Sequence, residues 1–150
     1  MTRSIYCAID TPDHQRAVML IDALAQVPGC GIKLGLEYFS ANGAVGIVKI
    51  RDLYPGVPLF LDIKYHDIPN TVAQAYRALA ALGVDYINLH AAGGSDMMKM
   101  AQDALVDTAT QAGVTPAKIL AVTVLTSLDD DNLRAVGQLT PAADQVLRLA

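Results

Sequence analysis

Residues 61–71 read LDIKYHDIPNT, and the interpretation of the whole chain depends on this stretch. It begins as an apolar strand and places Asp62, Lys64 and Asp67 within six positions. Side chains two residues apart on a strand point to the same face, so Asp62 and Lys64 are expected to project into one space. Such a cluster of opposite charges is costly to bury and seldom arises for packing alone. Pro69 then breaks the strand pattern and predicts a loop leading into a helix, an arrangement typical of a catalytic rim.

The composition is that of an apolar chain of 150 residues, a length that suits one domain with a sizeable core. Hydrophobic residues make up 53%, aromatic residues only 5%, and the mean hydropathy is +0.33, as expected for aliphatic parallel strands flanked by helices. The net charge is −4, and no basic run resembles a nucleic-acid footprint. No apolar stretch is long enough to span a membrane. The first ten residues, MTRSIYCAID, run into a strand pattern rather than a signal peptide, so we expect a cytoplasmic protein.

The two cysteines, Cys7 and Cys30, lie in apolar segments expected to form the first two strands. We interpret them as free, buried thiols in a reducing cytoplasm. A disulfide would be feasible if those strands were adjacent, but the spacing does not require one.

Short apolar runs alternate with longer helical patterns along the whole chain. The expected strands cover residues 4–10, 30–35, 57–64, 86–90 and 118–125, and the expected helices cover residues 12–25, 41–54, 69–82, 95–112, 130–136 and 141–150. Pro12, Pro69 and Pro141 fall where a first helical turn tolerates proline. Alternation at intervals of about 25 to 30 residues implies parallel βαβ units.

Two α/β architectures compete for this pattern. A doubly wound sheet favours GxGxxG after the first strand, whereas the turn here reads DTPDHQ. A TIM (β/α)8 barrel explains why polar residues recur at strand ends, because its active site is built from those ends. These residues are Asp10, Lys33, Asp62, Lys64 and Thr126. We therefore predict a single domain, residues 1–150, that supplies about the first five βα units of such a barrel. Since five units cannot close eight strands, the chain looks truncated.

Lys33, in the segment GIKLG, is the second informative residue because a lysine on a buried strand needs a partner for its charge. Taken alone, it would be a strand-end lysine that reaches solvent. Beside Asp62, Lys64 and Asp67, it completes an alternating array whose charges can satisfy one another. A purely structural ion-pair network at the barrel mouth remains the alternative to a catalytic role.

The segment LDIKYHDIPNT is similar to the signature of the orotidine 5′-phosphate decarboxylase family, of the bacterial type, whose reaction is the last step of de novo UMP synthesis. The other matching stretches are AIDTPD, GIKLG, NLHAAGG and TVLTS, so the resemblance spans essentially the whole chain. It implies a TIM-barrel homodimer with active sites at the dimer interface, working without a metal or an organic cofactor.

The resemblance also implies roles for individual residues. Lys33, Asp62, Lys64 and Asp67 match the family's catalytic Lys–Asp–Lys–Asp array, with Lys64 as the proton donor to C6 and Asp62 against the departing carboxylate. Asp10 and Lys33 match positions that bind the ribose hydroxyls. The residues implied to contact orotidine 5′-phosphate or UMP are Asp10, Lys33, Asp62, Lys64, Asp67, Ile68, Thr71 and Thr126, with Thr126 at the pyrimidine edge. Three of these would reach into the neighbouring subunit's site: Asp67, Ile68 and Thr71.

One departure from the family pattern and two alternatives follow. The family's phosphate-gripping loop and arginine lie beyond the stretch matched here, so we expect residues 1–150 alone to be weakly active or inactive. An inactive barrel fragment is therefore one alternative. A Mg²⁺-dependent sugar-phosphate decarboxylase or synthase of the same superfamily is the other. Those relatives share Asp-x-Lys-x-x-Asp but continue differently from Ile68–Thr71, which argues against them.

Two histidines near the array were considered as ligands. His66 and Asp62 could belong to a metal site, but Lys64 would lie inside the coordination sphere, so we expect a loop histidine facing solvent. His90 ends the fourth expected strand and is interpreted as a structural hydrogen-bonding residue. No metal ligand is predicted.

Overall fold

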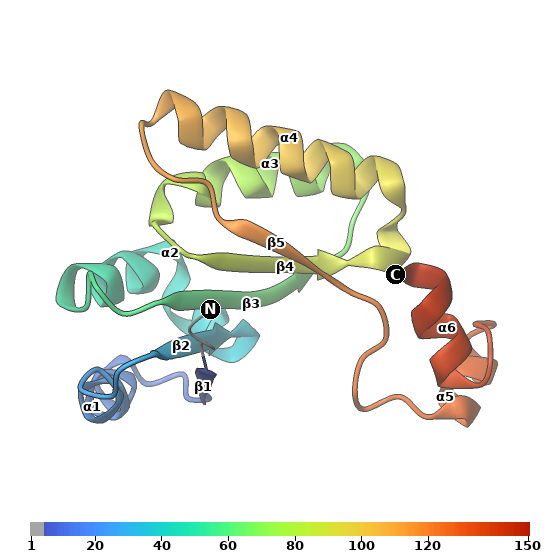
Figure 1. Cartoon of the computed structure of the whole chain (residues 1–150), viewed down its shortest axis with the longest axis horizontal. Helices are drawn as coiled ribbons and strands as arrows, with labels where there is room; N and C mark the ends of the chain where they lie inside the picture. Colours follow the sequence, from blue (N-terminus) through green and yellow to red (C-terminus); the bar gives the residue numbers. More distant parts are fainter. Residues whose placement is uncertain (1–4) are drawn as a thin grey trace.

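The computed structural model describes residues 5–150, in which five strands form one parallel sheet. They are β1 (Ile5–Ile9), β2 (Cys30–Gly35), β3 (Leu59–Tyr65), β4 (Tyr86–His90) and β5 (Lys118–Val122). The strands lie side by side in chain order, and every neighbouring pair is parallel (Figure 1). A doubly wound sheet would reverse this order at a switch point. The chain thus forms five consecutive βα units of a (β/α)8 barrel, and the predicted fold class is confirmed.

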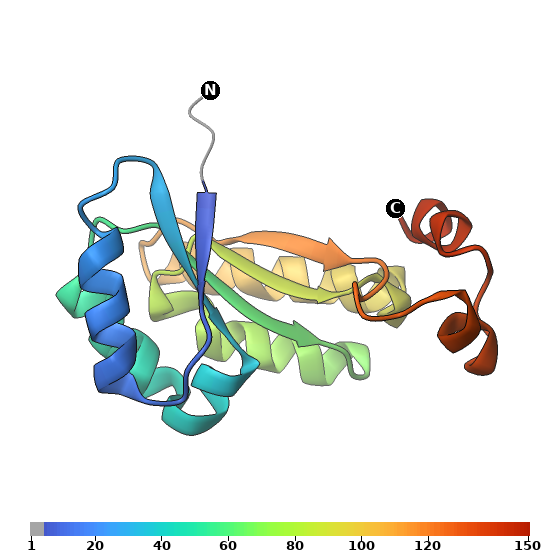
Figure 2. The same cartoon turned by 90° about the horizontal axis from the view of Figure 1, so that it is seen from below.

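Helices follow each strand of the sheet. They are α1 (His14–Leu24), α2 (Leu36–Leu53), α3 (Pro69–Leu79), α4 (Ser95–Gln111), α5 (Asp130–Ala135) and α6 (Ala142–Leu149), with 3-10 turns at η1 (Ala80–Leu82) and η2 (Ala91–Gly93). Helices α1 to α4 lie against one face of the sheet, whereas α5 and α6 lie beyond the carboxyl ends of the strands (Figure 2). None of the helices within residues 5–150 is long and apolar enough to cross a membrane.

The hydrophobic core lies between the sheet and these four helices. Alternate strand residues point into it and are almost fully buried, among them Ile32, Leu34, Leu61 and Leu89. The core is mainly aliphatic, as the composition predicts. Because side chains alternate along a strand, the residues between these face the opposite, concave side of the sheet. That side carries the charged array.

The half of the concave face near the amino ends of the strands is packed by aromatic rings. The rings of Tyr6, Phe60 and Tyr86 meet edge to face, with centroid distances from 5.6 to 6.3 Å. Gly31 of β2 makes this contact feasible, because a Cβ there would lie 2.7 Å from the Tyr6 ring. The aromatic cluster closes this half of the face, so the charged side chains occupy the carboxyl-terminal half.

Some predicted boundaries need correction. Ser4 lies outside the described residues, so the start of the first strand stays a prediction. The first helix begins after Pro12, because the Asp13 side chain accepts the backbone N–H groups of the first turn and caps it. The fifth strand ends at Val122 rather than at residue 125.

The largest boundary error concerns α2. It begins at Leu36, directly after β2, instead of at residue 41. Gly43 interrupts it with a φ of 60° and a ψ of −163°, which a glycine adopts readily. Next to this break, the Asn42 side chain donates to the carbonyls of Pro12 and Tyr38. The Asn–Gly pair therefore separates two helical segments. It interrupts the helical periodicity, so the sequence pattern predicted only the second segment.

Two fully buried tyrosines allow a matched test of the core. The Tyr76 hydroxyl has no hydrogen-bond partner within residues 5–150, whereas the Tyr38 hydroxyl donates to the Gly46 carbonyl and pairs with His14 Nδ1 at 2.7 Å. We expect Tyr76→Phe to raise the free energy of unfolding by about 1 kcal/mol, because a buried, unpaired hydroxyl is removed. Tyr38→Phe should lower it by about 1 kcal/mol, because paired groups lose their partner. Urea unfolding followed by circular dichroism measures both, and equal changes would contradict the assignment.

Candidate active site

The carboxylate of Asp62 is the centre of the charged array. Its side chain is 11% exposed and accepts three hydrogen bonds from three strands. Lys64 Nζ and Asn88 Nδ2 donate to Oδ1, the latter at 2.6 Å, and Lys33 Nζ lies 3.1 Å from Oδ2. Two cations therefore flank one buried anion.

Lys33 extends the array toward the first strand. It leaves the middle of β2 on the concave side, and its Nζ lies 3.9 Å from Asp10 Oδ1 as well as close to Asp62. The Asp10 side chain is 69% exposed, so this second contact is loose and faces solvent. The structure thus brings together four of the residues that the sequence singled out: Asp10, Lys33, Asp62 and Lys64.

The backbone at Lys64 is irregular. The ladder between β3 and β4 changes register between two residue pairs, Leu61 with Ile87 and Tyr65 with Leu89. Residues 62–64 therefore stand opposite Asn88 alone, and Lys64 adopts a φ of 58°. A non-glycine residue in this region costs about 1 to 3 kcal/mol and is found mostly at functional sites. Asp62 and Lys64 do share a space, as predicted, but a bulged strand rather than regular alternation brings them together.

The electrostatics of Asp62 follow from these contacts. Burial alone would raise the pKa of this carboxyl, but the hydrogen bonds from Lys64, Asn88 and Lys33 outweigh burial and hold its pKa below the usual range. Asp62 is therefore a fixed anion at neutral pH, and it keeps the two ammonium groups in place. The two lysines exceed the charge of this buried carboxylate, and the exposed carboxylate of Asp10 at the rim balances the remainder.

The second part of the signature segment lies apart from this array. Asp67, Ile68 and Thr71 are exposed, and Asp67 Oδ1 accepts the Ile68 backbone N–H at 2.6 Å. Ile68 is the N-cap of α3 and is 66% exposed. Neither an ion pair nor a hydrogen bond joins Asp67 to the lysines in the described part of the chain. The prediction that Asp67 shares in the charge balance of the array is therefore wrong for residues 5–150, where Asp67 and the array are separate groups.

Thr126 and the two histidines lie at the same end of the sheet. Thr126 is exposed in the loop after β5. His66 is exposed, as predicted, and its ring lies over that of His90, with centroids 5.4 Å apart. Burial, the charge of His66 and the charge of Lys64 lower the pKa of His90. Within residues 5–150, no three His, Cys, Asp or Glu side chains come together as a metal site. Cys7 and Cys30 are free thiols on neighbouring strands, as predicted, but both are half-buried rather than buried.

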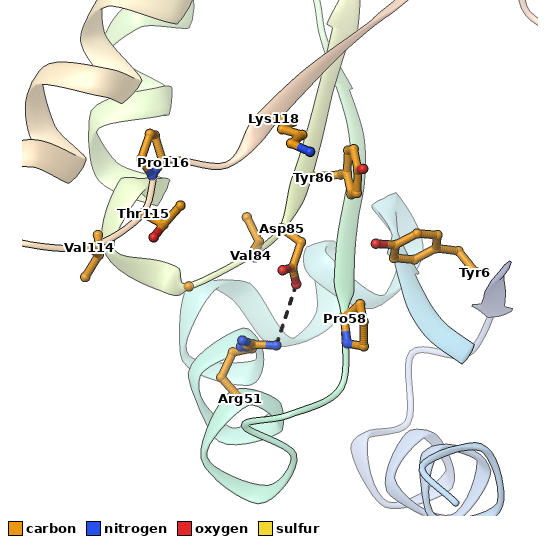
Figure 3. A pocket seen from close by; sticks show the side chains of 11 residues that line it. Tyr6, Arg51, Pro58, Val84, Asp85, Tyr86, Val114, Thr115, Pro116 and Lys118 are labelled. Atoms are coloured by element: carbon orange, nitrogen blue, oxygen red, sulfur yellow. Dashed lines mark ion pairs between the residues drawn. The ribbon is translucent and has the colours of Figure 1, made fainter. Parts of the chain in front are cut away.

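Hollows occur at both ends of the sheet. At the carboxyl end, a hollow of about 530 Å³ is lined by His66, Asp67, Ile68, Pro69, Ala92 and Gly93. At the amino end, a cavity of about 470 Å³ is lined by Tyr6, Tyr86, Lys118 and neighbouring loops (Figure 3). Arg51 in that cavity lies 3.9 Å from Asp85, which also accepts the Leu59 backbone N–H. These contacts fix the loops, and the charged array lies toward the other end of the strands.

Sequence reasoning missed Asn88. It is 2% exposed and contacts both Asp62 and the backbone of Lys64. The available signal was a polar amide inside the strand run YINLH, since asparagine is disfavoured in strands and costly to bury unpaired.

Comparisons with known proteins agree on one family. The family model described as "Orotidine 5'-phosphate decarboxylase / HUMPS family" matches residues 3–150. Two curated relatives named Orotidine 5'-phosphate decarboxylase are each 47% identical to this chain. The one from Paramagnetospirillum magneticum aligns with 100% of the chain and the one from Rhodospirillum rubrum with 97%. The chain spans only 63% and 58% of the lengths of these relatives.

Solved structures give the same result. The crystal structure of Orotidine 5'-phosphate decarboxylase from Lactobacillus acidophilus matches 99% of this chain with a TM-score of 0.89 and 40% identity, over 65% of its own length. A protein from Geobacillus kaustophilus, described as an uncharacterized conserved protein, matches 97% of the chain with a TM-score of 0.85 and 35% identity, over 66% of its own length.

The lowered pKa of Asp62 predicts how stability depends on pH. Because the folded-state pKa lies below the unfolded value of about 3.9, the ion pairs stabilise the fold fully above that value and are lost as the pH falls through the folded pKa. The free energy of unfolding should therefore fall below about pH 5. Asp62→Asn should flatten this fall, whereas Asp103→Asn on the exposed side of α4 should leave it unchanged. Urea titrations across this pH range test it, and equal slopes in the two variants would contradict it.

Proposed function

Because the chain belongs to the Orotidine 5'-phosphate decarboxylase / HUMPS family, we propose that its charged array decarboxylates orotidine 5′-phosphate to UMP. The observation that carries this proposal is the arrangement of Lys33 and Lys64 around the buried carboxylate of Asp62. The activity and the substrate are proposals, because the chain spans less than two thirds of its curated relatives.

The chemistry of this step calls for electrostatic stabilisation. When CO2 leaves orotate, the electron pair of the broken bond stays on C6, where no adjacent carbonyl delocalises it. Preorganised charge in a site shielded from water is the remaining source of stabilisation. The ammonium of Lys64 favours the negative charge and then gives its proton to C6. The resulting amine regains a proton from solvent, which the 35% exposed side chain of Lys64 reaches.

Asp62 and Lys33 prepare this step. Asp62 holds Lys64 through a hydrogen bond, and its negative charge lies against the substrate carboxylate that departs. Lys33 balances Asp62 from the neighbouring strand and, together with Asp10, binds the ribose hydroxyls. Thr126 contacts the pyrimidine edge. No metal or organic cofactor takes part in this proposal.

The separation of Asp67 from the array supports a dimeric site. Asp67, Ile68 and Thr71 are exposed at the start of α3, where a second copy of the chain has access to them. We propose that these residues complete the site of a neighbouring subunit in a homodimer. Such a dimer would carry two shared sites.

The alternative is a Mg²⁺-dependent sugar-phosphate enzyme of the same superfamily. The favoured proposal rests on Ile68–Thr71 and on relatives named Orotidine 5'-phosphate decarboxylase at 41–47% identity. A turnover assay with and without EDTA separates the two. Turnover of a sugar phosphate that EDTA abolishes would favour the alternative.

Removal of the ammonium of Lys64 should abolish decarboxylation. We expect Lys64→Ala to lower kcat at least ~100-fold, because both the proton donor and its charge are lost. Lys49→Ala, at an exposed position of α2, is the matched control and should keep the wild-type rate. The loss of absorbance of orotidine 5′-phosphate measures turnover. Equal rates in the two variants would contradict the proposed function. An unmodified chain without any turnover would favour the alternative of an inactive barrel fragment.

Mixed subunits test the shared site. Lys64→Ala and Asp67→Asn should each be inactive, but a mixed dimer combines an intact Lys64 with an intact Asp67 in one of its two sites. Equal mixing after refolding should restore about a quarter of the wild-type activity, as expected for random pairing in a symmetric dimer. Sedimentation analysis of the same samples reports the dimer. Absence of recovery in a verified mixed dimer would place Asp67 outside the partner's site.

A further inference from the structure

Asn88 lies on β4, opposite the bulged part of β3. It is 2% exposed, and both ends of its side-chain amide are paired. Oδ1 accepts the backbone N–H of Lys64 at 2.7 Å, and Nδ2 donates to Asp62 Oδ1 at 2.6 Å. The neutral side chain of Asn88 thus contacts two groups: the backbone of Lys64, which is the proposed proton donor, and the carboxylate of Asp62.

The bulge explains why the backbone of Lys64 needs this contact. The Leu59 carbonyl accepts the Asp85 N–H on the β4 side, so regular alternation along β3 would turn the Lys64 N–H toward β2. The bulge turns this N–H toward β4 instead. On that side the side-chain oxygen of Asn88 accepts it, in place of a backbone carbonyl. It therefore stabilises the left-handed backbone of Lys64, which directs the side chain back toward Asp62.

The polarity of the amide fits only one orientation. If its two terminal atoms were exchanged, the oxygen would face the Asp62 carboxylate and the NH2 group would face the N–H of Lys64. Both contacts would then be repulsive. An aspartate in this position would keep the acceptor for Lys64 but set two carboxylates against each other.

The surrounding charges make a neutral donor important. Asp62 is faced by Lys33 from β2 and by Lys64 from β3, with Asp10 beyond Lys33. At the end of β4, His90 experiences the charge of Lys64. Asn88 gives Asp62 a third hydrogen bond without altering this balance of charge.

We infer that Asn88 is a positioning residue for the proposed reaction: its amide fixes the carboxylate of Asp62 and the backbone of Lys64 relative to each other. The inference rests on the proposed function for its kinetic consequence. The two hydrogen bonds of Asn88 that it invokes can be measured without turnover.

Two variants and one control test this role. Asn88→Leu keeps the size of the side chain and removes both hydrogen bonds, and we expect kcat to fall up to about 100-fold, as for a misplaced catalytic group. Asn88→Asp should lose as much at neutral pH. Its rate should partly recover toward about pH 5, because two adjacent carboxylates then share one proton and restore the bridge. Gln102→Glu, which adds a charge on the exposed side of α4, should behave as wild type.

Nuclear magnetic resonance tests the geometry independently of turnover. In the unmodified chain, the Lys64 amide should be protected from hydrogen exchange, and the Asn88 side-chain NH2 resonances should shift as Asp62 titrates. The Asp62 carboxyl should titrate at higher pH in Asn88→Leu than in wild type, and at still higher pH in Asn88→Asp. The wild-type measurements suffice if neither variant folds.

The outcomes separate the two proposals. An unprotected Lys64 amide, NH2 resonances that ignore Asp62, or an Asp62 titration unchanged in both variants would overturn the role of Asn88, whatever the activity. The expected titrations in a chain without turnover would support the positioning of Asp62 and Lys64 and favour the inactive barrel fragment over a chain that is active by itself. Wild-type kinetics in Asn88→Leu would overturn the catalytic consequence.

Discussion

The carboxylate of Asp62, almost removed from solvent, is the constraint on which the rest of the concave face depends. A buried anion is tolerated only when its charge is balanced and its oxygens are hydrogen-bonded. Here the donors come from three adjacent strands: Lys33 from β2, Lys64 from β3 and Asn88 from β4. The order and the register of those strands therefore decide whether the carboxylate is satisfied. Fold and site are thereby linked through one side chain.

The two halves of the concave face have different tasks. Near the amino ends of the strands, the edge-to-face rings of Tyr6, Phe60 and Tyr86 pack across the gap left by Gly31. Near the carboxyl ends, charge replaces packing, and the strained backbone of Lys64 is held by hydrogen bonds rather than by apolar contacts. The amino-terminal half of the face is thus held by ring packing and the carboxyl-terminal half by ion pairs and hydrogen bonds.

The signature segment serves two locations at once. Its first part, in β3, builds the array around Asp62, while its last part, from Asp67 onward, leaves the array and turns outward into α3. A single stretch of chain can thus contribute to two sites if two copies meet at this surface. The loop and the helix start are the parts that would link catalysis to assembly, because they follow the catalytic strand directly.

The sequence by itself determined the alternation of strands and helices, since apolar periodicity is a local property. The bounds of β2 and β4 were predicted correctly. Of the four charges predicted to form the array, Lys33, Asp62 and Lys64 lie together, whereas Asp67 lies apart. Only the tertiary structure decided the bulge, the left-handed backbone of Lys64 and the role of Asn88. These features rest on contacts between residues 24 and 26 positions apart in the chain. A local sequence pattern does not specify strand pairing. The contacts of Asn88 with Asp62 and Lys64 therefore become evident only when β4 is placed beside β3.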